Sequence, residues 1–259
     1  MTTVSVIGCG HMGSALVKGL SAAGTHRVTA CDLDTDALEA VEPYCAETTT
    51  DVAAAAAASD VVIVAVKPDV VGAVLEELDL DPAQTLVTIA AGVSTDVVAP
   101  RTDATVVRLM PNLAAETRTM AAAVAWDEVD EDVRTLLADL GEFVAIDEDL
   151  MDVATALNGS GPAFVYYLIQ AMQAGAAAEG MDPDDARTLA AQTFKGAAET
   201  VLRSEESLDD LIDAVATEGG TTIEGMRVLW DSDADDAVGD AVHAAADRSR
   251  ELAGGLDDE

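Results

Sequence analysis

The chain has 259 residues, a length that fits one large domain or two ordinary ones and can bury a real core. It carries 49 acidic residues against 13 basic ones, a net charge of −36, which argues against nucleic acid and anionic membranes as partners. The sequence holds no apolar run of about 18 residues and begins with a strand pattern rather than a basic leader, so we expect neither a membrane span nor a secretory signal.

The first part of the chain alternates short apolar strands with helix-length segments. Strands are predicted at residues 4–7, 28–31, 61–66, 86–89, 105–110, 121–126 and 143–146, with helices at 12–23 and 51–58. The run 61–66 is apolar throughout, as expected for a parallel strand that is covered on both faces. This alternation predicts an α/β fold with a Rossmann-type, doubly wound and mostly parallel sheet.

The strand patterns stop near residue 152. Beyond that point, helices are predicted at residues 154–157, 163–179, 183–202, 207–216, 222–230 and 237–252. We therefore expect two domains: a dinucleotide-binding domain over residues 1–152 and an all-helical domain over residues 153–259.

The first strand leads into a glycine-rich loop that opens a helix. The loop consists of Gly8, Cys9, Gly10, His11, Met12 and Gly13. In this pattern the first glycine makes the tight turn, the second lets the backbone approach a pyrophosphate, and the third allows close packing of helix against strand. A strand before the loop and a helix after it make a dinucleotide site a specific prediction.

Asp32 lies 19 residues after Gly13, at the end of the second predicted strand. An acidic side chain there accepts a hydrogen bond from the ribose 2′-hydroxyl of the coenzyme. Asp32 would repel a 2′-phosphate, and Asp34 and Asp36 add to that repulsion. The coenzyme is therefore NADPH or NADH, with a modest preference for NADH. The alternative is that Asp32 belongs to one more acidic surface loop.

Three further segments end successive strands, at the edge where sheets of this kind bind ligands. They supply the remaining candidate coenzyme residues: Ala65, Val66, Lys67, Pro68, Ala90, Ala91, Gly92, Met110, Pro111 and Asn112. Lys67 is one of only three lysines in the chain, and we expect it to lie close to an anion. The alternative for Lys67 is an ordinary solvated loop lysine.

A second run of glycines and hydroxyls lies between two predicted helices of the second domain. Its candidate substrate residues are Thr217, Gly219, Gly220, Thr221 and Thr222. Paired glycines let the backbone approach a ligand, and the free amides at a helix start favour a carboxylate. A plain helix connection with a threonine cap is the alternative.

Taken together, these motifs resemble pyrroline-5-carboxylate reductase, the last enzyme of proline biosynthesis, in an acidic version of haloarchaeal type. The similarity runs over nearly the whole chain and includes the glycine loop, residues 65–68, 90–93, 110–112 and 158–164, and most specifically 219–224. It implies that the chain reduces 1-pyrroline-5-carboxylate to L-proline with a nicotinamide coenzyme. It also implies that the helical domain serves in substrate binding and dimerisation.

The resemblance further assigns roles within the second loop. It implies that amides in residues 217–222 bind the substrate carboxylate and that Thr222 is the catalytic residue, which hydrogen-bonds near the ring nitrogen. The loop of one subunit would face the nucleotide domain of another, so the family is dimeric or larger. The chain departs from the family by having Thr217-Glu218 where Ser-Pro is usual. Glu218 places a carboxylate near the expected anion site, which is unfavourable unless it points to solvent.

The mechanism has no obvious general acid, because the three histidines lie at positions 11, 26 and 243, outside the substrate loop. We expect the imine to arrive protonated and Thr222 to orient its nitrogen. A related β-hydroxyacid-dehydrogenase-type or imine reductase is one alternative, although the former uses a lysine that residues 162–179 lack. A dinucleotide-binding regulator without turnover is another.

The acidic residues are spread through periodic segments rather than gathered in a tail, which we interpret as halophilic adaptation. Self-repulsion opposes a compact fold in dilute buffer, whereas molar salt shortens the Debye length to about 3 Å and screens it. We therefore expect a salt-rich cytoplasm. Cys9, Cys31 and Cys45 give no disulfide framework, and no Cys/His spacing typical of a metal site occurs, so we expect reduced thiols and no metal.

Overall fold

The structure is a computed structural model that describes residues 1–126 and 131–254. The chain forms two compact units. One contains residues 1–160 together with the C-terminal segment from His243, and the other contains residues 161–242. The division between a dinucleotide-binding domain over residues 1–152 and a helical domain over residues 153–259 stays a prediction.

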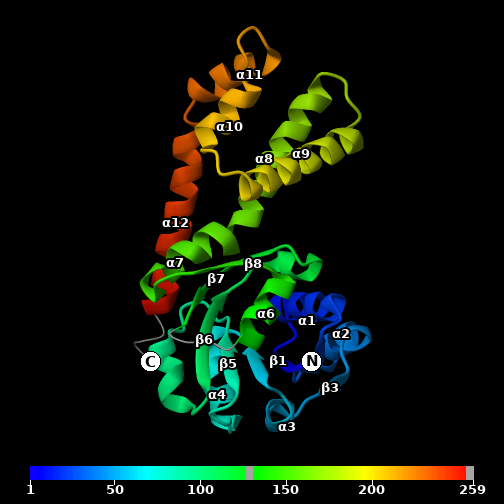
Figure 1. The fold of residues 1–259 in the computed structure, drawn as a ribbon, viewed down its shortest axis with the longest axis vertical. Coiled ribbons are helices and arrows are strands. Elements are labelled where there is room, and N and C mark those ends of the chain that lie inside the picture. Colours follow the sequence, from blue (N-terminus) through cyan, green and yellow to red (C-terminus); the bar gives the residue numbers. More distant parts are fainter. Residues whose placement is uncertain (127–130, 255–259) are drawn as a thin grey trace. The chain divides into compact units, whose positions relative to one another are not determined.

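The first unit is built on an eight-stranded sheet within the described residues, with the strand order β3-β2-β1-β4-β5-β6-β7-β8 (Figure 1). The strands are β1 Thr2–Ile7, β2 His26–Cys31, β3 Glu47–Thr49, β4 Val61–Val64, β5 Thr85–Thr88, β6 Thr105–Met110, β7 Met120–Ala125 and β8 Gly141–Ala145. Neighbouring strands are parallel except for β6 and β7, which pair antiparallel. The predicted doubly wound, mostly parallel Rossmann-type sheet is confirmed.

Helices and short turns connect these strands. The α-helices of this part are α1 His11–Ala23, α2 Thr35–Val41, α3 Val52–Ala57, α4 Pro68–Glu77, α5 Thr95–Val98, α6 Glu131–Leu140 and α7 Met151–Ala154. The shorter turns are η1 Glu42–Tyr44, η2 Ala99–Arg101, η3 Leu113–Thr117, η4 Glu148–Leu150 and the π-helical η5 Thr155–Gly159.

Strand β4 shows why an unbroken apolar run suits the centre of this sheet. Successive side chains of a strand point to opposite faces. Val61 and Ile63 enter the core under α1 and α6, whereas Val62 and Val64 enter the core under α3 and α4. All four residues are buried, so each face of the strand is covered by helices.

The differences from the predicted strands concern strand ends and the sheet edge. Strand β4 ends at Val64, two residues earlier than predicted, because Ala65 and Val66 turn away to line a cavity. Strands β5 and β7 begin one residue earlier than predicted, and β1, β2 and β8 begin two residues earlier. Strand β3 was missed, because its three residues Glu47–Thr49 are polar and pair only with β2 at the edge of the sheet.

The second part of the chain is helical in its described residues, as predicted. Its helices are α8 Gly161–Ala178, α9 Pro183–Arg203, α10 Leu208–Val215, α11 Thr221–Trp230 and α12 Ala234–Gly254, of which α12 continues into the first unit. Large apolar side chains stand exposed on these helices, among them Tyr166, Tyr167, Leu202 and Val228. Exposed apolar surface of this kind is typical of protein interaction sites.

Candidate functional site

The glycine loop between β1 and α1 needs glycine at two positions for steric reasons. Gly8 has φ +98°, and its N–H donates to the Cys31 carbonyl at 2.8 Å. A Cβ on Gly8 would lie 2.7 Å from the carbonyl oxygen of Ala65, and one on Gly13 would lie 1.8 Å from that of Gly8. These glycines therefore pack the loop tightly against the start of α1 and the end of β4.

Gly10 has the opposite environment. A Cβ on Gly10 would meet no atom within 4 Å, and the residue is exposed at the N-cap of the 13-residue helix α1. Gly10 has no side chain with which to cap the first amides of the helix, so these amides can bind an anion with help from the helix dipole. The open space and the uncapped amides fit the pyrophosphate of a dinucleotide.

Asp32 follows β2 and is bound to the glycine loop. Its Oδ2 accepts a hydrogen bond from the Cys9 amide at 2.5 Å, and its Oδ1 accepts one from the Asp34 amide at 2.9 Å. Burial, reinforced by the Asp32 carboxylate, raises the pKa of the Cys9 thiol to about 12. Cys9 is therefore protonated near neutral pH.

A cavity of about 350 Å³ lies between the glycine loop, the end of β2, the segment after β4 and one face of α4. Six of the predicted coenzyme residues line it: Gly8, Gly10, Asp32, Ala65, Val66 and Lys67. The rest of the lining is Ile7, Cys31, Leu33, Val52, Val70, Ala73, Val74 and Glu77. The residues from α4 were missed, although the spacing of 70, 73, 74 and 77 behind Lys67 and Pro68 is that of one helix face.

The other predicted coenzyme residues do not line this cavity. Gly92, with φ +78°, lines a separate hollow of about 140 Å³ together with Pro68. Ala90 is buried and Ala91 half-buried after β5, and His11 and Met12 begin α1. Met110, Pro111 and Asn112 are buried. Their contact with a coenzyme stays a prediction.

The side-chain amides of Asn112 and Asn158 form hydrogen bonds to backbone carbonyls across the same junction. Asn112 Nδ2 donates to the Asn158 carbonyl at 3.1 Å, and Asn158 Nδ2 donates to the carbonyls of Met110 and Ala121 at 2.7 and 3.0 Å. Asn112 Oδ1 accepts from the amides of Ala114 and Ala121. Both ends of the Asn112 side chain are thus engaged within the chain, which joins the end of β6 to the π-helical turn η5.

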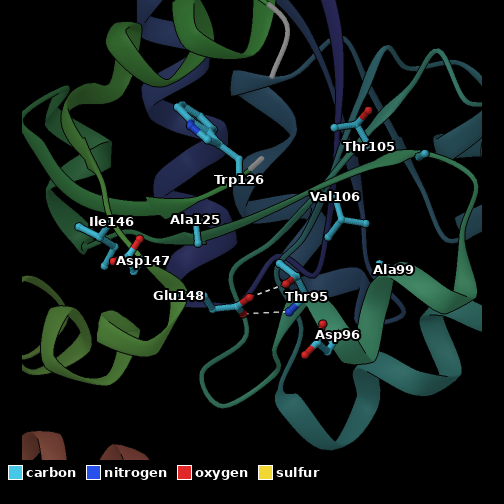
Figure 2. A pocket seen from close by; sticks show the side chains of 11 residues that line it. Thr95, Asp96, Ala99, Thr105, Val106, Ala125, Trp126, Ile146, Asp147 and Glu148 are labelled. Atoms are coloured by element: carbon cyan, nitrogen blue, oxygen red, sulfur yellow. Dashed lines mark hydrogen bonds between the residues drawn. The ribbon is translucent and has the colours of Figure 1, made fainter. Parts of the chain in front are cut away.

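A second cavity of about 400 Å³ lies beside α5 and the ends of β7 and β8 (Figure 2). At its edge Glu148 accepts hydrogen bonds from the Thr95 amide at 2.9 Å, from the Thr95 hydroxyl and from Arg108 Nη1 at 2.8 Å. Burial pushes the pKa of Glu148 upward, but these donors outweigh it and hold that pKa below its usual range. Asp96 and Asp147 also line this cavity.

The predicted substrate loop lies in the second unit and ends at the N-terminus of α11. Gly219 has φ +77°, a conformation that favours glycine. The Gly220 N–H donates to the Thr217 carbonyl at 3.0 Å, and a Cβ on Gly220 would crowd that same oxygen. Gly220 is the N-cap and lacks a capping side chain, so the amides of Thr221 and Thr222 remain available to an anion. Glu218 is exposed.

The described residues contain neither a metal-binding cluster nor a membrane-spanning helix. Within residues 1–126 and 131–254, no group of three or more His, Cys, Asp or Glu side chains is arranged to hold a metal ion. No helix in the same ranges is long and apolar enough to cross a membrane.

Comparison with known proteins shows which family the chain belongs to. Residues 148–252 match the family described as pyrroline-5-carboxylate reductase dimerisation, and residues 3–92 match the family described as NADP oxidoreductase, coenzyme F420-dependent. The pyrroline-5-carboxylate reductase of Methanosarcina acetivorans is 38% identical, over 96% of this chain and 97% of that protein. The chain belongs to the pyrroline-5-carboxylate reductase family.

Solved structures of this reductase family agree with that assignment. The enzyme from Coxiella burnetii superposes with a TM-score of 0.86 at 30% identity, covering 97% of this chain and 98% of that one. The Plasmodium falciparum enzyme, determined with NADP bound, superposes with a TM-score of 0.82 at 25% identity over 97% and 98% of the two chains. The reductase fold therefore extends over nearly the whole chain.

Proposed function

We propose that the protein reduces 1-pyrroline-5-carboxylate to L-proline, the last step of proline biosynthesis, with a reduced nicotinamide dinucleotide. The full-length relationship to named reductases carries this proposal, and the coenzyme cradle around Gly8, Gly10 and Gly13 supports it. The alternatives, a β-hydroxyacid-dehydrogenase-type or imine reductase and a regulator without turnover, have less support because relatives that are 33–38% identical over 96% of this chain are named as pyrroline-5-carboxylate reductases.

The coenzyme, when bound, supplies the hydride that reduces the C=N bond of the substrate. The first amides of α1 hold its pyrophosphate, and Lys67 adds a positive charge at the edge of the same cavity. The amides of Thr221 and Thr222 bind the substrate carboxylate, and the Thr222 hydroxyl orients the protonated ring nitrogen. Holding the two reactants in one geometry is the main contribution of the protein, because the nitrogen already carries its proton.

The coenzyme preference follows from Asp32. Its carboxylate is fixed at the end of β2 by two backbone amides, where it accepts a hydrogen bond from a ribose 2′-hydroxyl and repels a 2′-phosphate. NADH is therefore the better coenzyme, although NADPH shares the rest of the cradle.

The protein works as a dimer or larger homo-oligomer whose subunits share each active site. Residues 148–252 match a dimerisation family, and the exposed apolar side chains of α8 to α11 offer a surface for a second copy to cover. The loop at Gly219–Thr222 then serves the coenzyme of a neighbouring subunit. The net charge of −36 suits a salt-rich cytoplasm, where the repulsion between subunits is screened.

A single assay tests the proposed reaction. The oxidation of NADH and of NADPH is followed by absorbance with 1-pyrroline-5-carboxylate in molar KCl, and L-proline is identified as the product. We expect turnover with both coenzymes and a higher kcat/KM with NADH. If neither coenzyme supports turnover, the proposed function is contradicted. A preference for NADPH would contradict only the role given to Asp32.

A further inference from the structure

One face of α4 forms a long wall of the coenzyme cavity. The helix begins after Lys67, and Val70, Ala73, Val74 and Glu77 all line the cavity. At 1.5 Å per residue, the distance along the helix from Lys67 to Glu77 is about 15 Å. The wall therefore starts beside the candidate phosphate site at Lys67 and ends at Glu77, at the last residue of α4.

Glu77 is the only one of these four α4 residues with a charged side chain, and its carboxylate lies in an unfavourable place. It is exposed at the C-terminal end of α4, where the helix dipole disfavours a carboxylate and the last turn has no basic residue. Among residues 1–126 and 131–254, no donor forms a hydrogen bond or ion pair with its carboxylate. The acceptor capacity of Glu77 is thus free for a ligand.

The position of Glu77 relative to β2 is indicated by Cys31. Burial raises the pKa of the Cys31 thiol to about 11, and the nearby carboxylates of Asp32, Asp51 and Glu77 contribute to that increase. Glu77 therefore lies close enough to the end of β2 to face the part of the cavity that begins at Asp32.

The part of the cavity between Asp32 and Glu77 has apolar surfaces that suit a flat base. Leu33 is 82% exposed and Val70 41% exposed, and with Val74 they give apolar surfaces that a bound ring would cover. Beyond the ribose, adenine presents an exocyclic amino group, which is a donor, whereas a carboxylate is only an acceptor.

We propose that Glu77 selects the adenine base of the coenzyme by accepting a hydrogen bond from its exocyclic amino group. This inference rests on the proposed function only in placing a nicotinamide dinucleotide in the cavity. Hypoxanthine carries a carbonyl oxygen at the same position, so the Glu77 carboxylate would face a second acceptor and lose the bond. Hydrogen bonds to charged groups of this kind correspond to about a tenfold to hundredfold difference in affinity.

The experiment compares the binding of NADH with that of its deaminated analogue, reduced nicotinamide hypoxanthine dinucleotide. Fluorescence titration in molar KCl measures both dissociation constants for the wild-type chain, for Glu77→Gln and for Glu76→Gln. Glu76 is the matched control, because it is an exposed acid on the same turn that does not line the cavity. We expect the wild type and Glu76→Gln to bind NADH at least about tenfold more tightly than the analogue. In Glu77→Gln the two affinities should become similar, since an amide both donates and accepts.

Equal affinities in the wild type, or a preference that Glu77→Gln retains, would overturn the proposal, as would a chain that binds neither dinucleotide. The titration contains no pyrroline carboxylate and needs no turnover. A protein that shows the expected preference but does not reduce pyrroline carboxylate would therefore contradict the proposed reaction alone.

Discussion

Arg108 donates a hydrogen bond of 2.8 Å from Nη1 to Oε1 of Glu148, and this ion pair joins strand β6 to the turn η4. Arg108 is buried, and its Nε has no partner among the described residues, so Glu148 is its charge partner in this part of the chain. Glu148 also accepts from both donors of Thr95 at the start of α5. One carboxylate thus fixes three segments that surround the second cavity.

Glu148→Gln should lower the free energy of unfolding by about 1–3 kcal/mol, because it leaves a buried guanidinium without a counter-charge. The pKa of Glu148 is depressed in the folded state, so its contribution is complete above the unfolded value of about 4.3 and is lost as pH falls through the lower folded pKa. The stabilities of both proteins, measured by denaturant titration at a series of pH values, should therefore converge as the pH falls below the folded pKa of Glu148. Asp149→Asn, at an exposed neighbouring acid, is the control, and an equal loss in that variant would contradict the role of the ion pair.

Gly10→Ala and Gly13→Ala should separate coenzyme binding from folding. The added Cβ meets no atom at Gly10 but the Gly8 carbonyl at Gly13. We expect Gly10→Ala to unfold at the wild-type temperature while binding NADH at least about tenfold more weakly, because the methyl group occupies the space for a pyrophosphate. Gly13→Ala should lose at least about 1–3 kcal/mol of stability from overpacking. Thermal unfolding and fluorescence titration provide the two measurements, and normal NADH binding by Gly10→Ala would argue against the proposed phosphate site.

Thr222→Ala should reduce kcat/KM for pyrroline carboxylate by about tenfold to a hundredfold, since it removes a hydrogen bond to a charged group. Coenzyme affinity, measured by titration without substrate, should stay unchanged. Thr222→Ser keeps the hydroxyl and should restore most of the rate. A wild-type rate for Thr222→Ala would remove Thr222 from the mechanism.

Asp32→Asn should raise the ratio of kcat/KM for NADPH to that for NADH by about tenfold, because it removes a charge that repels the 2′-phosphate. The asparagine oxygen can still accept from one of the two amides that hold Asp32. Glu39→Gln, an exposed acid on α2, serves as the control for a general change in net charge. If both variants change the coenzyme ratio equally, the effect is not specific to Asp32.

The unfolding temperature should rise steeply with KCl between about 0.1 and 2 M, because screening relieves the repulsion of the acidic surface. Sucrose, which stabilises folded proteins without screening charge, should produce a smaller gain. Equal unfolding temperatures at the two KCl concentrations would contradict halophilic adaptation.

The architecture of the first unit could be predicted because its central strands are apolar on both faces and its glycine loop has a defined sequence. Strand β3 could not, since an edge strand with the sequence Glu47-Thr48-Thr49 buries too little to leave a pattern. Six of the predicted coenzyme residues line one cavity, but the sequence did not predict that Val70, Ala73, Val74 and Glu77 form a wall of the same cavity. From the sequence alone, Val70 and Val74 are equally consistent with packing of α4 onto the sheet.

The substrate loop shows a different limit. Its two glycines predicted a close backbone approach, and Gly219 does adopt a left-handed conformation. The sequence could not show that the Gly220 amide is already bonded to the Thr217 carbonyl, which leaves Thr221 and Thr222 as the better candidates for anion binding. The proposal that this loop faces a coenzyme bound to another subunit concerns subunit assembly, which no local pattern encodes.

The hydrogen bonds of the Asn158 side chain also have a consequence for chemical ageing. Asn158 precedes Gly159, and an asparagine followed by glycine readily loses its amide when the next backbone nitrogen can reach the side-chain carbonyl carbon. Two donated hydrogen bonds hold the Asn158 side chain against the carbonyls of Met110 and Ala121, which restrains the rotation that attack by that nitrogen requires. The folded protein therefore protects this amide, and preparations that pass through the unfolded chain lose the protection.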